Sequence, residues 1–129
     1  MIKLTLPFPL TVNHMWGQSG HRKYLKQSAH EFRSQVSEAV AEQGIKLEGR
    51  LAIFVSLYAP TRREYDIDNR LKSLLDALQN AGVFDDDEQI DWLWVGRREV
   101  VRGGMCKVVI VQADADLIGL YHEINKEVI

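Results

Sequence analysis

The segment "LAIFVSLY", residues 51–58, is an almost unbroken run of aliphatic and aromatic side chains. A strand with one solvated face alternates apolar and polar residues, whereas a strand covered on both faces is apolar throughout. We therefore expect residues 51–58 to form a central strand of a β-sheet, with other elements packed against both faces of that sheet.

The sequence before this strand predicts one strand and one helix. "IKLTL", residues 2–6, alternates like a strand, and the apolar residues of segment 28–43 recur with the helical period up to Gly44. Residues 10–26 show no periodicity, and we expect a long connection there.

The sequence after the central strand predicts one long helix and two strands. Leucines at 71, 74, 75 and 78 predict a helix from about residue 69 to 80, with Gly82 as its stop. "IDWLWVG", residues 90–96, and "MCKVVIVQ", residues 105–112, are typical of strands, and Gly103 with Gly104 suits a hairpin turn between them. Residues 114–125 are expected to form a short helix.

The order β-α-β-α-β-β, followed by a short C-terminal helix, predicts an α+β fold (α/β mixed). We expect a mixed sheet with two main helices in a single domain that spans residues 1–129. The three tryptophans, Trp16, Trp92 and Trp94, are expected in a packed core, although the last two share a strand face that could stack on bases or form a dimer contact.

Composition excludes several classes of protein. No run of about 18 apolar residues is present and Pro7 interrupts the N-terminal apolar segment, so we expect a cytoplasmic protein without membrane association. The single cysteine, Cys106, cannot form an internal disulfide and is expected to be a buried, inert thiol. The net charge of −2 does not indicate a nucleic-acid binder, but basic residues gather in segment 13–33 while acidic residues gather in segment 85–91.

Two aspartates, Asp66 and Asp68, precede the leucine helix. If residues 64–67 are extended, both carboxylates project from one face and can share a cation, with Lys72 one helical turn beyond Asp68. The simpler interpretation is that Asp68 caps the helix, for about 0.5–2 kcal/mol, and that Lys72 is a solvated partner of Asp68 or Asp76.

A second acidic group, Asp85, Asp86 and Asp87, follows the end of the same helix. If Gly82 reverses the chain, Asp87 or Asp86 can return to meet Asp66 and Asp68. Three carboxylates of this kind suit Mg²⁺, a hard ion that prefers oxygen ligands.

The segment "RREYDIDNRLKSLLDALQNAGVFDDDEQI", residues 62–90, resembles the core of the RusA family of Holliday junction resolvases. That motif has a basic stretch, D-x-D-N, a lysine four residues past the second Asp, D-A-L, A-G and D-D-x-Q. "LPFPLTVN", residues 6–13, is similar to the opening strand and turn of the family. The chain departs from the pattern at Glu64 and Tyr65, where the basic stretch is shorter, and at Asp85, where the family has an apolar residue.

The resemblance implies a catalytic set of Asp66, Asp68, Asp87 and Lys72, with Asp86 as the alternative metal ligand. It further implies a homodimer, Mg²⁺ dependence, for which Mn²⁺ is expected to substitute, and cleavage of four-way branched DNA during recombination and repair. Such an enzyme would associate with the nucleoid when bound to DNA.

DNA contacts are expected mainly at basic side chains, with Asn13 of the opening turn added: Asn13, Arg22, Lys23, Lys26, Arg62, Arg63 and Arg70. Arg97, Arg98 and Arg102 are second choices. Two other functions stay open from the sequence. One is a phosphomonoesterase of the haloacid-dehalogenase type, whose D-x-D supplies a nucleophile; the other is a non-catalytic nucleic-acid-binding module.

Overall fold

The computed structural model describes residues 1–114 and 116–128. The elements, with short 3₁₀ turns written η, follow one another in this order: β1 Ile2–Leu6, η1 Val12–His14, β2 Trp16–Ser19, β3 Arg22–Leu25, α1 Gln27–Gln43, β4 Leu51–Tyr58, η2 Asp68–Arg70, α2 Leu71–Asn80, η3 Asp87–Gln89, β5 Ile90–Arg97, β6 Met105–Gln112 and α3 Leu117–Val128. A four-stranded sheet has the order β1-β6-β4-β5, and β2 pairs with β3 in a separate small sheet. The predicted α+β class with a mixed sheet is confirmed.

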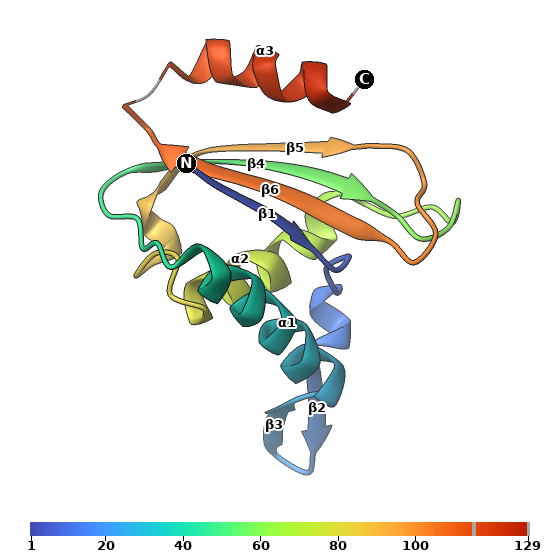
Figure 1. The fold of residues 1–129 in the computed structure, drawn as a ribbon. Helices are drawn as coiled ribbons and strands as arrows, with labels where there is room; N and C mark the ends of the chain where they lie inside the picture. The colour runs from blue at the N-terminus through green and yellow to red at the C-terminus, as the bar shows by residue number, and fades with distance from the viewer. Residues whose placement is uncertain (115, 129) are drawn as a thin grey trace.

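The central strand is the expected one. Every residue of β4 is buried, and the strand pairs in parallel with β5 and antiparallel with β6. Figure 1 shows α1 and α2 on one face of the sheet and α3 on the other. Accordingly, Ile53 and Val55 belong to the main core with α1 and α2, whereas Phe54 packs in a smaller cluster with Ile124 of α3.

The expected hairpin between β5 and β6 is wrong, because β4 lies between these two strands. Helix α2 links β4 to its parallel neighbour β5, so β6 reaches the opposite side of β4 only if the chain crosses beyond the end of β4. Along this crossing, the amide of Arg98 donates to the carbonyl of Leu57 at 2.8 Å. Gly103 and Gly104 do turn the chain, with φ of 86° and 71°. Both strands could be predicted from their residue patterns. The strands with which they pair could not.

The two main helices match the prediction in position and in buried face. Helix α1 buries Ala29, Phe32, Val36 and Val40 and ends at Gly44, whose φ is 64°. Helix α2 buries Leu74, Ala77 and Leu78 and begins one short 3₁₀ turn later than expected. Both helices therefore pack on the sheet through the apolar stripes seen in the sequence.

The end of α2 reverses the chain as predicted. Gly82 has a φ of 86°, its amide donates to the carbonyl of Gln79, and the amide of Val83 donates to the carbonyl of Leu78. This pair of hydrogen bonds is a Schellman motif, which needs a residue with positive φ after the helix. Val83 and Phe84 are then buried in the main core, so the chain returns along the sheet side of the helix.

Residues 10–26 form more structure than the long connection expected from the sequence. They contain η1 and the β2–β3 hairpin, whose pairing leaves Gly20 and His21 as a two-residue turn. Figure 1 shows this hairpin extending beyond the end of α1, away from the main sheet. Because both faces of such a small hairpin are largely solvated, its sequence lacks the apolar periodicity that reveals other strands.

Two of the three tryptophans are not in the core. Trp92 on β5 is 52% exposed and Trp16 on β2 is 46% exposed. Trp94 stacks on Phe54 with ring centroids 4.6 Å apart and on Trp92 at 5.6 Å. The expectation of a packed core is therefore wrong for Trp92, because β5 forms one margin of the sheet, and for Trp16, because it lies on the largely exposed β2–β3 hairpin.

The C-terminal helix and the cysteine follow the sequence. Helix α3 begins at Leu117, slightly later than expected, and residue 115 of the predicted segment lies outside the described residues. Cys106 is buried, and burial raises the pKa of its thiol to about 12. None of the helices in the described part of the chain has the length and apolar character needed to span a bilayer.

Candidate active site

The D-x-D segment lies between the end of β4 and the start of α2, but its geometry differs from the prediction. Ile67, between the two aspartates, has helical dihedral angles of −67° and −27° rather than extended ones. In a helical backbone, side chains two apart diverge by about 200° instead of sharing one face. Asp66 and Asp68 therefore do not project from a common strand face.

Asp68 does not cap the helix. It is the first residue of η2, and neither η2 nor α2 has a side-chain hydrogen bond at its cap position. The side chain is exposed and lies in the first turn, where a negative charge is favourable. The simpler interpretation of Asp68 as a cap is therefore wrong, and its carboxylate is accessible to a ligand.

Lys72 pairs with Asp76 one turn further along α2. Its Nζ lies 2.9 Å from Oδ1 of Asp76. The hydrogen bond and charge of Asp76 raise the pKa of Lys72 above its ordinary value, and the charge of Asp87 adds a smaller contribution. Asp87 therefore returns to the neighbourhood of Lys72, as the predicted chain reversal requires.

The three consecutive aspartates after α2 make different contacts. The Asp85 carboxylate pairs with Lys46 at 2.5 Å. Asp86 caps η3 by accepting a hydrogen bond from the amide of Glu88, in a capping box with Gln89. These contacts engage the first two carboxylates, which favours Asp87 as the one that faces α2.

The end of α2 holds the backbone of Asp87. Its amide donates to Oε1 of Gln79 at 3.2 Å. The side chain of Asp87 is half-buried, whereas its neighbours Asp85, Asp86 and Glu88 are exposed. This contact ties the acidic turn to the helix that begins beside Asp68.

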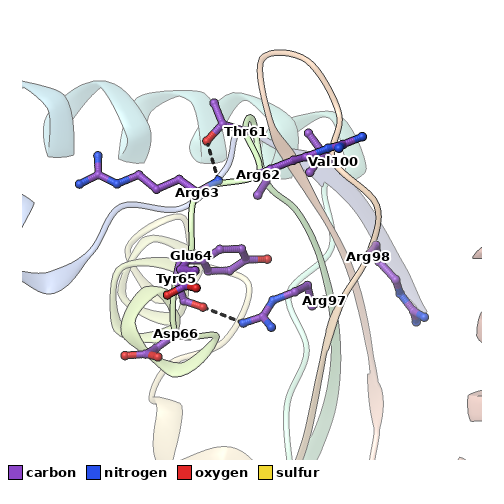
Figure 2. Close-up of a pocket in the computed structure, with 10 residues that line it drawn as sticks. Thr61, Arg62, Arg63, Glu64, Tyr65, Asp66, Arg97, Arg98 and Val100 are labelled. Carbon is purple, nitrogen blue, oxygen red and sulfur yellow. Dashed lines mark hydrogen bonds between the residues drawn. The ribbon is translucent and has the colours of Figure 1, made fainter.

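A pocket of about 480 Å³ opens beside Asp66. Figure 2 shows its polar lining, which comes from the segment after β4 and from the end of β5: Thr61, Arg62, Arg63, Glu64, Tyr65, Asp66, Arg97 and Arg98. A second pocket of about 640 Å³ shares Asp66 and Arg63 and extends to Asn69, Arg70 and His14. A carboxylate set among several arginines suits the binding of a phosphate-bearing ligand with a cation.

Two of the arginines that line the pocket form hydrogen bonds with other parts of the protein. Nη2 of Arg97 donates to the carbonyl of Tyr65 at 2.6 Å, and its guanidinium lies 4.7 Å from the Tyr65 ring centroid. Arg98 instead donates to Asn125 of α3 at 2.7 Å. Arg97 therefore fixes the residue before Asp66, while the guanidinium of Arg98 is engaged with α3.

Arg70, predicted to contact DNA, is also engaged within the protein. Its Nη1 donates to the carbonyl of Pro9 at 2.6 Å, and its guanidinium lies 4.6 Å from the centre of the Phe8 ring. Burial lowers its pKa from the ordinary value. These contacts give Arg70 a structural role in joining α2 to the segment after β1.

The other residues of the predicted DNA set do not line the two pockets that contain Asp66. Arg22 and Lys23 are on β3, Lys26 precedes α1, and Asn13 is in η1. Among the described residues that line the two pockets, none of these four occurs. The structure therefore joins Arg62 and Arg63 with Asp66 and leaves the hairpin residues as a separate basic group.

The sequence did not reveal Arg50, which forms ion pairs with Glu88 inside the η3 turn and with Asp91 just after it. No motif surrounds Arg50, and its partners lie about forty residues away along the chain. Only the pairing of β4 with β5 brings these residues together.

A metal site formed by three carboxylates stays a prediction. Among residues 1–114 and 116–128, no group of three or more His, Cys, Asp or Glu side chains is placed so that it could hold a metal ion. By chemistry, however, the donors fit a hard divalent cation, because Asp66, Asp68 and Asp87 offer only carboxylate oxygens.

These features define a class: an α+β protein with exposed carboxylates beside an arginine-lined pocket, as expected of an enzyme that acts on phosphodiesters. Within that class, the chain belongs to the RusA family. The family model described as "Endodeoxyribonuclease RusA" matches residues 7–111.

Named relatives support the same membership. The crossover junction endodeoxyribonuclease rusA of Enterobacteria phage HK97 is 32% identical over 115 residues, which cover 88% of this chain and 96% of the relative. The crossover junction endodeoxyribonucleases of Escherichia coli K12 and Enterobacteria phage 82 are each 29% identical, over 84% of this chain and 92% of each relative. The likeness therefore extends over nearly the full length of these proteins.

Proposed function

We propose that this chain is a Mg²⁺-dependent endodeoxyribonuclease that resolves Holliday junctions. The observation that carries the proposal is the position of Asp66, at an arginine-lined pocket, in a chain of the RusA family. The relatives are named as crossover junction endodeoxyribonucleases, and Asp66, the first residue of the D-x-D segment, lines this pocket.

Three carboxylates would hold the ion: Asp66, Asp68 and Asp87. Like charges repel at short range, so their approach to one another would depend on the cation. When bound, Mg²⁺ would supply a Lewis acid for the phosphoryl oxygens and lower the pKa of the attacking water. Asp86 is the weaker alternative, because it already caps η3.

Lys72 would stabilise the negative charge that develops on the phosphoryl oxygens. Its ammonium now pairs with Asp76, and its side chain is largely exposed, so it can turn toward a phosphate without a change of fold. The raised pKa of Lys72 extends the charged state of the ammonium to higher pH than for an isolated lysine.

The pocket arginines would bind the phosphates that flank the cleaved bond. Arg62 and Arg63 are exposed on the loop before Asp66, and Arg22 and Lys23 would reach a more distant part of the substrate from the β2–β3 hairpin. Hydrolysis is expected to leave 5′-phosphate and 3′-hydroxyl ends.

We further propose that the enzyme is a homodimer, because a four-way junction must be cut in two opposed strands and a twofold dimer supplies two sites. The exposed Trp92 on β5, at the margin of the sheet, is a candidate for the contact. Action on branched DNA would place the protein in the cytoplasm, at the nucleoid. Sedimentation as a monomer at micromolar concentration with junction present would contradict the dimer.

The test is to incubate the purified protein with a labelled four-way junction, a linear duplex and a phosphate monoester, each with Mg²⁺. We expect paired nicks in the junction only, and no nicking by Asp68→Asn while junction binding persists. Hydrolysis of the monoester would instead support the haloacid-dehalogenase alternative, although residues 59–65 separate β4 from Asp66. Binding without cleavage by the wild type would support the non-catalytic module.

A further inference from the structure

Arg50 lies immediately before β4. Its guanidinium joins two acidic residues that follow Asp87 in the chain, Glu88 and Asp91. Nη1 donates to both carboxylate oxygens of Glu88, at 3.0 and 3.1 Å, and Nη2 donates to the main-chain oxygen of Glu88 at 2.6 Å. Nε and Nη2 also donate to Oδ1 of Asp91, at 3.0 and 2.6 Å. Only a planar guanidinium offers enough fixed donors to hold these acceptors together.

The backbone that carries Arg50 is itself anchored. The carbonyl of Arg50 accepts a hydrogen bond from the amide of Ala113 at 2.9 Å, and the next residue, Leu51, is fully buried in the main core. The carbonyl of Gly49 accepts a hydrogen bond from Nε2 of Gln89 at 2.9 Å. The backbone at Arg50 is therefore fixed at the start of the central strand, which limits where its guanidinium can lie.

A β-bulge presents Asp91 to Arg50. In the pairing of β4 with β5, Leu51 lies opposite Ile90 and Ala52 lies opposite Trp92, so Asp91 has no partner in the register. A bulge redirects a side chain that regular pairing would fix, and such irregularities recur near functional sites. The bulge places the Asp91 carboxylate where it shares one guanidinium with Glu88.

These contacts hold the residues that precede and follow Asp87 in the chain. Asp86 caps η3, Glu88 and Asp91 are held by Arg50, and Gln79 accepts a hydrogen bond from the Asp87 amide. Within the described part of the chain, no hydrogen bond or ion pair engages the Asp87 carboxylate. The turn is therefore fixed through its neighbours, while this carboxylate acts on Lys72 through its charge.

We propose that Arg50 is a positioning residue that holds the η3 turn so that the Asp87 carboxylate faces α2 and can bind the catalytic divalent cation. The inference rests on the proposed function, because it assigns Asp87 as a ligand. An exposed ion pair usually adds little to folding stability. A positioning role therefore predicts that loss of Arg50 weakens the metal site more than it weakens the fold.

The test compares Arg50→Met, Arg50→Lys and Asp91→Asn with the wild type. Lys46→Ala is the matched control, since Lys46 makes a single exposed ion pair with Asp85 of the same segment. Four measurements are made: Mn²⁺ binding to the free protein by electron paramagnetic resonance, nicking rate against Mg²⁺ concentration, junction affinity in Ca²⁺, and thermal unfolding.

We expect Arg50→Met to weaken Mn²⁺ binding by about tenfold and to raise the Mg²⁺ concentration needed for half-maximal nicking by a similar factor. Mutation of residues that orient metal ligands in other proteins has effects of this size. Junction affinity should not change. Arg50→Lys should not restore binding, because an ammonium cannot bridge Glu88 and Asp91 as a guanidinium does. Lys46→Ala should match the wild type.

Unchanged Mn²⁺ binding by folded Arg50→Met, or an equal loss in Lys46→Ala, would overturn the inference. If Arg50→Met does not fold, Asp91→Asn decides by the same Mn²⁺ measurement, because it removes the charge at nearly constant volume. A wild type that binds Mn²⁺ but nicks no junction would reject the proposed function, while the comparison of variants would still decide the role of Arg50. A wild type that binds no Mn²⁺ would overturn both.

Discussion

At the scale of single residues, three adjacent aspartates show how position separates side chains of identical chemistry. Asp85 pairs with Lys46, Asp86 caps η3, and Asp87 lies near Lys72. The sequence left open which of them could join Asp66 and Asp68, because spacing alone gives all three a similar reach. Their contacts in the folded chain favour Asp87.

Asp87→Asn is therefore expected to lower the rate of junction nicking by on the order of 100-fold. The substitution removes the negative charge of a proposed metal ligand but keeps the size and shape of the side chain. Asp85→Asn is the matched control and should keep nearly full activity, since it loses only an exposed ion pair. The measurement is single-turnover nicking at saturating junction. Equal losses in the two variants would contradict the assignment of Asp87.

Lys72 allows a pH test. Asp76 raises the pKa of Lys72, so the ammonium stays protonated to higher pH than an isolated lysine, and activity that needs it should fall only at strongly alkaline pH. Asp76→Asn removes the main cause of the shift and should move the alkaline limb of the nicking profile to lower pH. An alkaline limb that stays in place would show that Lys72 is not the titrating group.

At the scale of elements, the sequence was sufficient wherever burial imposes a pattern. The continuous apolar run of β4 and the leucine stripe of α2 both describe a face that packs in the core. Gly44 and Gly82 mark helix ends because each adopts a positive φ. These features are local, so they can be seen in a short window of residues.

The features that were missed depend on contacts between distant segments or on solvated surfaces. The small β2–β3 sheet has little buried surface, and the separation of β5 from β6 depends on the path of the whole chain. In the site, the helical backbone at Ile67 replaced the expected extended one. The contacts of Arg50 with Glu88 and Asp91 follow from strand pairing, which no local pattern reveals.

Gly82 offers a test at this scale, because the turn after α2 directs the acidic segment back along the helix. A Cβ at Gly82 would meet no neighbouring atom, but the φ of 86° is strained for other residues. Gly82→Ala is therefore expected to lower the free energy of unfolding by about 1–2 kcal/mol, and Gly82→Asn by less, as measured by urea denaturation. If the alanine variant is as stable as the wild type, the turn does not depend on this conformation.

At the scale of the whole molecule, an acidic chain carries local basic surfaces. The net charge is −2, yet Arg62, Arg63 and Arg97 line one pocket and Arg22 and Lys23 lie on the hairpin. Binding to DNA would therefore depend on where the cations lie rather than on their total number.

The double substitution Arg62→Ala with Arg63→Ala is expected to make junction affinity less sensitive to salt. Each lost phosphate contact should reduce the slope of log affinity against log salt concentration by about 0.9. Affinity is measured in Ca²⁺ across a range of ionic strength, with Lys126→Ala on α3 as a control outside the two pockets and outside the predicted DNA contacts. An unchanged slope would remove these arginines from the DNA-binding surface.

The central claim is that carboxylates before and after α2 hold one divalent cation. A crystal structure of the protein with Mn²⁺, with the ion located by its anomalous scattering, tests this claim most directly. We predict one peak within about 2.0–2.4 Å of carboxylate oxygens from Asp66, Asp68 and Asp87. A peak bound elsewhere, or one that leaves Asp87 beyond ligand distance, would contradict it.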